Sequence, residues 1–298
     1  MENVVSDHNI SNVRGMRVNN TGKGEVMNLK NLLSYSTIRL ALVAGASCLL
    51  LQNANATLLF SEPFGQSPQA LGTAVNAGNS TAWSGGNAGL NIVSGNLTYP
   101  GLVDQGGNEL SITNGSSGGS INTYANQTAG QVYYSFLFDP IVADGGNQYF
   151  TALNPGTSAP NGGSDAIDAY SYSNGKIEIR AAAQSASAGT GTALTLGTTY
   201  LIVEEIDLDA KTASLWIDPT PGAVAPTATA SLSGITATAV DDVGFKAQTG
   251  AGSYLVDNLL IGTTWADVTP AAVPEPSTFA LAGAGLGIMF MMIRRRRS

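Results

Sequence analysis

Short apolar or alternating runs recur between clusters of Gly, Asn, Ser and Asp from Thr57 to Pro270. No part of this region carries the long 3.6-residue period of an amphipathic helix, and short runs bounded by turn-forming residues are typical of strands. About 214 residues are enough for one domain with a substantial core. The sequence therefore predicts a single all-β domain over residues 57–270. The expected strands are Leu58–Ser61, Leu90–Ile92, Leu97–Tyr99, Glu109–Ile112, Val132–Phe138, Tyr149–Leu153, Ala166–Tyr172, Lys176–Arg180, Thr199–Ile206, Ala213–Ile217, Val240–Lys246 and Ser253–Ile261.

Turn chemistry indicates how two of the joins are made. Asn174-Gly175 is a dipeptide favoured in two-residue hairpin turns, and it predicts pairing of Ala169–Ser173 with Lys176–Arg180. A second turn, at Asp207–Thr212, closes the strand before it onto the strand after it. Antiparallel sheets with this many strands must pack face to face to bury their apolar sides, which predicts a β-sandwich or jelly roll.

Three physical parts follow one another beyond Thr269, in residues 271–298. Pro274 and Pro276 lock their own φ angles and disfavour helix before them, so this part is an extended handle. Ser277–Ile293 carries no charge, and its 17 residues reach roughly 26 Å as a helix. That length is slightly short of a bilayer core of about 30 Å. The arginines after it favour the cytoplasmic side, so we predict a transmembrane helix over 277–293 with the body of the chain outside.

The order of these parts resembles the PEP-CTERM sorting signal of Gram-negative bacteria that make extracellular polysaccharide. The residues that carry this resemblance are Pro274, Glu275, Pro276, Arg294, Arg295, Arg296 and Arg297. It implies that exosortase, a membrane-embedded cysteine transpeptidase-like enzyme, is a partner and cuts the chain near Pro274–Pro276. The protein would cross the inner membrane, stay there briefly as a single-pass protein, and then reach the outer surface or the extracellular matrix. The alternative is a plain C-terminal anchor.

The first 56 residues have the pattern expected of a segment that directs export. Residues 1–26 are polar without apolar periodicity, and we interpret them as a disordered extension upstream of a true start at Met27. Residues 27–56 combine a basic region, the apolar run Leu40–Leu51 and a small-x-small site at Ala54 and Ala56. This pattern predicts a signal-peptide helix that enters the secretion translocon and is cut after Ala56. The alternative is an uncleaved membrane anchor.

Loss of the leader and the tail narrows the chemistry of the exported part. It removes His8 and Cys48, the only histidine and the only cysteine. Ser-His-Asp or Cys-His catalysis, histidine or thiolate metal sites and disulfides are then excluded. Residues 57–270 hold 17 acidic side chains against four basic ones, a net charge of −13. Such a domain is not built to bind nucleic acid.

Several motifs of the β region occur in an order that resembles the concanavalin A-like, laminin-G-like jelly rolls of exported PEP-CTERM proteins. An unrelated β-sandwich or a β-helix is the alternative. The motifs are Glu62-Pro63-Phe64, Trp83, Gly95–Tyr99, Val132–Phe136, Gly197–Tyr200 with Val203, Ser214–Pro219 and Val256–Trp265.

Glu205-Ile206-Asp207-Leu208-Asp209 is the sharpest enzyme signal. Jelly-roll glycosidases of the laminarinase type carry Glu-x-Asp-x-Glu on one strand as nucleophile, helper and acid, but here the acid position is the shorter Asp209. Residues i and i+4 lie about 13 Å apart along a strand, whereas a retaining pair of carboxyls needs roughly 5 to 5.5 Å. Asp207–Lys211 also lies where a hairpin is required. We therefore interpret the motif as a turn and predict that the protein is not an enzyme.

Carbohydrate binding is a separate hypothesis, because sugar rings stack on exposed aromatic side chains. Trp83, Trp216 and Trp265 are candidates, although large aromatic residues equally serve a core. The leading hypothesis is a non-catalytic cell-surface or matrix protein. A lectin-like module for extracellular polysaccharide is the alternative, and a laminarinase-type glycosidase is less favoured.

A calcium site is the one metal hypothesis. In jelly rolls of the kind resembled, the first and final strands lie side by side, which would bring Glu62 near Asp257. Calcium takes six to eight oxygen ligands at about 2.3 to 2.6 Å, and Asn258 and backbone carbonyls could complete the shell. The rival interpretation is that Asp257 binds backbone amides while Glu62 faces solvent.

Overall fold

The chain divides into two compact units, Met1–Ala54 and Asn55–Ser298, and the described residues all belong to the second. The predicted signal peptide, its cleavage site, the sorting signal and the span 277–293 lie outside them. Within the part that is described, no helix is long and apolar enough to cross a membrane. The computed structural model describes residues 58–272 except 72–82, 87–88, 116–117, 147, 155–159, 161–164, 172–174, 182–186, 190 and 192.

Sheet A is the larger of two antiparallel sheets in the described residues. It runs in the order β14-β13-β12-β7-β16-β5-β4-β2, and β1 shares one edge of β16 with β5. The first and last strands of the domain are therefore neighbours, as expected. The strands are β1 (Leu58–Glu62), β2 (Gln69–Ala70), β4 (Leu90–Val93), β5 (Glu109–Ile112), β7 (Gln131–Val142), β12 (Tyr200–Asp207), β13 (Thr212–Ile217), β14 (Ala230–Ser233) and β16 (Ser253–Gly262).

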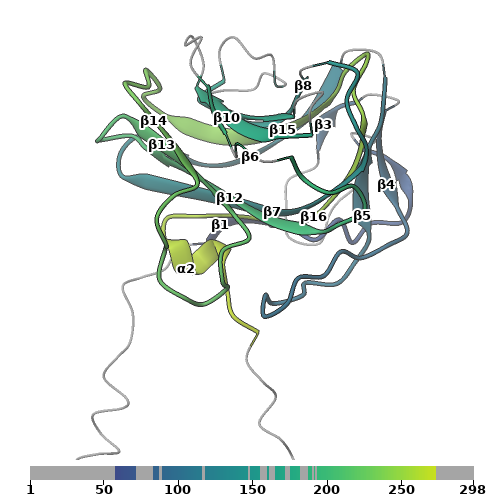
Figure 1. Cartoon of the computed structure of the whole chain (residues 1–298), viewed down its shortest axis with the longest axis horizontal. Coiled ribbons are helices and arrows are strands. Elements are labelled where there is room, and N and C mark those ends of the chain that lie inside the picture. Colours follow the sequence, from purple (N-terminus) through teal and green to yellow (C-terminus); the bar gives the residue numbers. More distant parts are fainter. Residues whose placement is uncertain are drawn as a thin grey trace, which may run out of the picture. The chain divides into compact units, whose positions relative to one another are not determined.

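Sheet B lies over sheet A as a second layer, in the order β11-β10-β9-β8-β15-β6-β3 (Figure 1). The all-β prediction is confirmed, and the two antiparallel layers are consistent with a β-sandwich. The strands are β3 (Ser84–Gly85), β6 (Gly118–Gln127), β8 (Gln148–Asn154), β9 (Ile167–Ser171), β10 (Ile177–Ala181), β11 (Ser187–Gly189) and β15 (Val240–Ala247).

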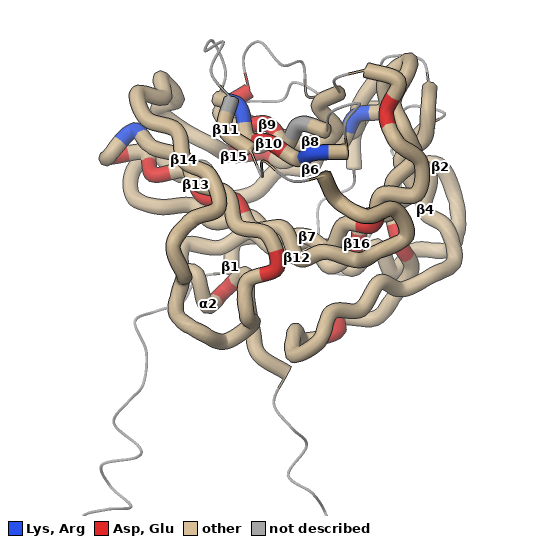
Figure 2. The backbone as a smooth tube through the Cα atoms, in the orientation of Figure 1, with Lys and Arg blue, Asp and Glu red and all other residues tan. Residues whose placement is uncertain are grey.

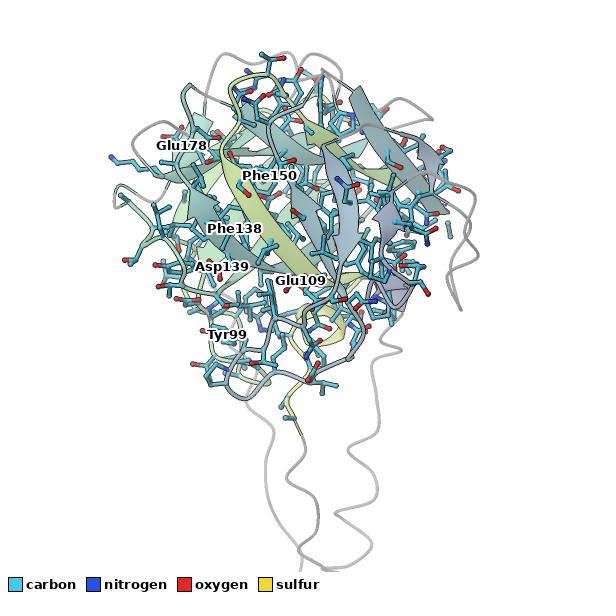
Figure 3. All side chains as sticks on the ribbon, turned by 90° about the vertical axis from the view of Figure 1, so that its right-hand side faces the viewer. Tyr99, Glu109, Phe138, Asp139, Phe150 and Glu178 are labelled. Carbon is cyan, nitrogen blue, oxygen red and sulfur yellow. The ribbon has the colours of Figure 1, made fainter. Side chains whose placement is uncertain are left out.

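The main core lies between the sheets, and β7 shows why this sequence builds it. Alternate side chains of a strand point to opposite faces. Tyr134, Phe136 and Phe138 enter the main core, where the Phe138 ring stacks on Phe150 of β8 with centroids 5.0 Å apart (Figure 3). Tyr133 and Leu137 enter a second apolar cluster on the other side of β7. The nearly continuous apolar run of β7, interrupted only by Ser135 between Val132 and Phe138, thus reflects burial on both faces.

The second cluster, here called the apolar cap, covers the outer face of sheet A. Above that face lie the helix α2 (Trp265–Val268), the loop 94–104 and the loop 218–229. The buried members of the cap are Leu97, Leu102, Tyr133, Leu137, Leu201, Val203, Trp216, Leu260 and Val268.

Two local predictions were wrong. Leu97–Tyr99 is not a strand: Leu97 packs in the apolar cap, and its N–H donates to the Asp257 carboxylate. The strands on either side of Asn174-Gly175 do pair, with Ser171 opposite Ile177 and Ala169 opposite Ile179. This register differs by one residue from that of the predicted two-residue turn, which would place Ser171 opposite Glu178.

Candidate functional site

The last described residues are fixed to two loops of sheet A's outer face. Gly222 N–H donates to the Thr269 carbonyl at 2.8 Å, and Val103 N–H donates to the Pro270 carbonyl at 3.0 Å. Ala272 N–H in turn donates to the Gly101 carbonyl at 2.8 Å. The domain therefore stays ordered up to Ala272, one residue before the predicted handle begins.

The motif Glu205–Asp209, which was weighed as a glycosidase signal and interpreted as a turn, lies at a hairpin. Strand β12 ends at Asp207 and β13 begins at Thr212. One Asp207 carboxylate oxygen accepts N–H bonds from Asp209 at 3.0 Å and Ala210 at 2.7 Å, and Lys211 has a φ of 58°. The turn interpretation of this motif is confirmed.

Glu205, the remaining carboxylate of the motif, lies on the outer face of sheet A. It is in register with Tyr133 and Ser214, and its side chain is buried. Burial raises its pKa, while hydrogen bonds from Tyr133 and Ser214 offset part of that rise. Its hydrogen-bond partners are thus neutral side chains of its own sheet, while repulsion from Asp207 adds to the rise of its pKa.

Each tryptophan packs against other residues of the domain and donates its indole N–H to one of them. Trp83 is 4% exposed and its indole N–H donates to Glu62 at 2.8 Å. Trp216 and Trp265 donate to backbone carbonyls of the loop 218–229, each at 2.9 Å, and their ring centroids lie 5.0 Å apart. These contacts favour the core role over a platform for sugar stacking.

Of the two predicted calcium ligands, Glu62 faces the main core. It is fully buried and lies in register with Leu259 of β16. Its carboxylate accepts N–H bonds from Phe64 at 2.8 Å and from Trp83. The expectation that Glu62 faces solvent was wrong.

Asp257 faces the other side of sheet A. It is in register with Leu137 of the apolar cap, and its carboxylate accepts N–H bonds from Leu97 at 2.9 Å and Asn258 at 2.6 Å. Burial raises its pKa to about 7, although these two N–H donors act against the rise. Asn258 has a φ of 53° at the bulge that follows.

The structure therefore does not bring Glu62 and Asp257 together, because their side chains occupy opposite faces of the sheet. Among the described residues, no group of three His, Cys, Asp or Glu side chains could hold a metal ion. The hydrogen bonds of Asp257 match the rival interpretation, in which it binds backbone amides.

Sequence reasoning missed a group of buried carboxyls on the outer face of sheet B. Asp168 of β9 and Asp242 of β15 are fully buried, and so is Asp165 just before β9. Ile167 and Ala169 on either side of Asp168, and Val243 after Asp242, belong to the main core, so these two acids point away from it. Pro160 lies over Gly244 of the same face so closely that a Cβ there would clash. In Figure 2, acidic segments coloured red mark β9 and β10.

Two of these carboxyls, those of Asp168 and Asp242, have a pKa above neutral pH. Burial raises the pKa of Asp168 to about 10; a hydrogen bond and repulsion from Asp165 add to the rise, and Arg180 at 3.7 Å opposes it. Burial raises the pKa of Asp242 to about 8, although a hydrogen bond with the Asn154 side chain opposes this rise. A protonated carboxyl can donate a hydrogen bond but is a poor base and a poor cation ligand. The group is thus better suited to structure than to catalysis.

Glu204 is another buried acid that sequence reasoning missed, and it faces the main core. It is fully buried on β12, in register with Leu215 and Tyr134. Burial raises its pKa to about 8. The only sequence signal for Asp168, Glu204 and Asp242 was a carboxylate inside a predicted strand.

The comparison with protein families gives one match. The model described as the PEP-CTERM protein-sorting motif matches residues 272–297. This confirms the sorting motif predicted from the sequence and implies processing by exosortase. No curated protein matches the chain.

Solved structures give only distant likenesses. The T. cruzi calreticulin globular domain matches over 72% of this chain and 90% of that one, with 10% identity and a TM-score of 0.44. A sialidase matches over 71% of this chain with 13% identity and a TM-score of 0.44, and the match spans 19% of that sialidase. Trypanosoma rangeli sialidase matches over 58% of this chain and 27% of its own, with 13% identity and a TM-score of 0.38. Such likenesses say nothing about substrate or activity.

Proposed function

We propose that the chain is an exported, non-catalytic protein of the cell surface or extracellular matrix, which exosortase cuts from its C-terminal tail. The observation that carries the proposal is the coincidence of two boundaries. The sorting motif begins at residue 272, and within the described part of the chain the last backbone hydrogen bond is made by Ala272. A cut near Pro274–Pro276 would therefore release the β domain with every hydrogen bond of its described residues intact.

The non-catalytic part of the proposal rests on the described carboxylates. Asp207 and Asp209 belong to a hairpin, while Glu205 accepts its hydrogen bonds from neutral side chains on its own sheet. On sheet B, Asp168 and Asp242 are fully buried and have a pKa above neutral pH. None of these arrangements provides the two facing carboxyls that a glycosidase needs.

We further propose that the sandwich is a concanavalin A-like jelly roll and that 277–293 spans the inner membrane before processing. The pairing of β1 with β16 and the two antiparallel layers support the first point. The uncharged run of 17 residues supports the second.

Sorting can be tested in exosortase-bearing cells by following the location of the protein. We expect the double variant Pro274→Ala, Pro276→Ala to stay in the inner membrane while the unchanged protein leaves it. Unchanged release of the double variant would contradict the proposal. The purified domain, incubated with a panel of polysaccharides, should yield no new reducing ends. Reducing ends that disappear in Glu205→Gln would instead establish a glycosidase.

A further inference from the structure

The tail leaves the domain from a surface that carries no charged residue. We call it the exit surface and define it as residues 98–103, 219–227 and 271–272. Its parts are joined by the hydrogen bonds that Gly222, Val103 and Ala272 donate. Asp104 and Asp218 adjoin these segments in the sequence, and Asp267 belongs to the neighbouring helix α2.

Apolar side chains stand out from this surface. Val224 is 89% exposed and Val103 is 36% exposed. The loop that holds Val224 is nevertheless fixed, because Trp265 donates its indole N–H to the Ala223 carbonyl at 2.9 Å. Tyr99, labelled in Figure 3, joins the two loops, since a hydrogen bond to Asp218 helps to raise its pKa to about 12 after burial. A fixed surface therefore presents exposed valines beside the exit of the tail.

The length of the chain between Ala272 and the predicted membrane span limits the distance of this surface from the membrane. Four residues, Val273–Pro276, separate Ala272 from Ser277, where the uncharged run begins. A fully extended chain advances at most about 3.6 Å per residue, so the Cα atoms of Ala272 and Ser277 are at most about 18 Å apart. Two prolines stiffen this link. The headgroup layer is itself roughly 5 to 8 Å thick on each side of the bilayer core.

We infer that, before processing, the exit surface rests on the lipid headgroup layer of the membrane. This inference rests on the proposed function, because it needs 277–293 in the bilayer. A surface without charges can approach the headgroups without the cost of desolvating carboxylates, which the rest of this acidic domain would incur. The short link and the uncharged surface thus both favour an orientation in which the exit surface faces the membrane.

The test uses the unprocessed chain, made in cells without exosortase and placed in phosphatidylcholine vesicles. In a Cys48→Ser background, single cysteines at Val224→Cys and Val103→Cys carry an environment-sensitive fluorophore. Val142→Cys is the matched control, because this valine is 53% exposed and lies at the opposite end of β16 from α2. Lipids with a nitroxide on the headgroup should quench the two exit-surface labels severalfold more than the control label.

A variant with a longer link between the domain and the predicted membrane span provides a second test. About 12 Gly and Ser residues inserted between Ala272 and Val273 would add a flexible coil of roughly 20 Å. Quenching at Val224→Cys should then fall toward the control, while the chain still floats with the vesicles.

Equal quenching at all three positions would overturn the orientation and leave the sorting proposal intact. Weak quenching in vesicles, with crosslinking of the Val224 label to exosortase in cells, would replace the lipid contact by a protein contact. Failure of the chain to float with vesicles would overturn the membrane span, and this inference with it.

Discussion

The outer face of sheet A is closed mainly by apolar side chains around two buried acids, Glu205 and Asp257, whereas the outer face of sheet B buries a group of three acids. On sheet A, Leu97, Leu137 and Trp216 pack in the apolar cap beneath α2 and two loops. On sheet B, Asp168 and Asp242 are fully buried and keep their protons at neutral pH. Burial of apolar groups is favourable at any pH, but burial of acids is tied to their protonation. The packing of the apolar cap should therefore contribute stability at any pH, whereas the contribution of the buried acids should change with pH.

The largest expected effect is on the apolar cap. Trp216→Ala removes a 6% exposed indole, its contact with Trp265 and its hydrogen bond to Pro226. We expect the free energy of unfolding to fall by about 3 to 5 kcal/mol. Urea denaturation measures this loss, which should be the same at pH 5 and pH 8. Trp216→Phe keeps most of the ring and should cost less. A loss from Trp216→Ala below about 1 kcal/mol would show that the cap is not part of the cooperative core.

The next effect concerns the acids of sheet B. Asp168 has a folded-state pKa of about 10 and Asp242 one of about 8, against 3.8 for the unperturbed side chain. Below pH 3.8 both states hold the protons, and as the pH rises toward 8 to 10 only the folded state keeps them. Stability should therefore fall across this window, by at most about 1.4 kcal/mol per pH unit for each carboxyl.

Asp168→Asn should flatten this dependence, because an amide of similar shape has no proton to lose. Unfolding followed in urea from pH 5 to pH 8 measures the slope for the unchanged protein and the variant. Asp242→Asn should have a similar effect, and the double variant should fall short of the sum because the two sites interact through Asp165. An identical slope in all four proteins would refute the protonated cluster.

The smallest expected effect is that of calcium. Glu62 and Asp257 face opposite sides of sheet A and already accept N–H bonds. We therefore expect the thermal midpoint to be the same in saturating calcium and in excess chelator. A midpoint that rises with calcium in the unchanged protein, but not in Asp257→Ala, would restore the calcium site.

Local patterns were enough to predict the fold class. Apolar runs and turn residues gave the all-β domain and the hairpin at Asp207–Thr212, since both depend on neighbours in the sequence. Strand β6 was missed because its ten residues are mostly polar and only Ile121 is a buried apolar side chain. Leu97–Tyr99 was misassigned because a loop that packs in an apolar cap has the same composition as a strand.

The buried acids show a different limit. The sequence places Asp168 and Asp242 inside predicted strands, and alternation even assigns them to the face away from the core. It does not say that this face is covered, because coverage depends on residues far away along the chain, such as Pro160 over Gly244. The sorting motif, in contrast, is read from consecutive residues and was predictable in full.

The intact mass of the exported product tests the central claim most directly. In cells with exosortase, the product should begin near Thr57 and lack Phe279–Ser298, with the β domain complete through Ala272. Its mass should shift to that of the uncut tail when exosortase is removed. A released product that retains Phe279–Arg297 would contradict the account.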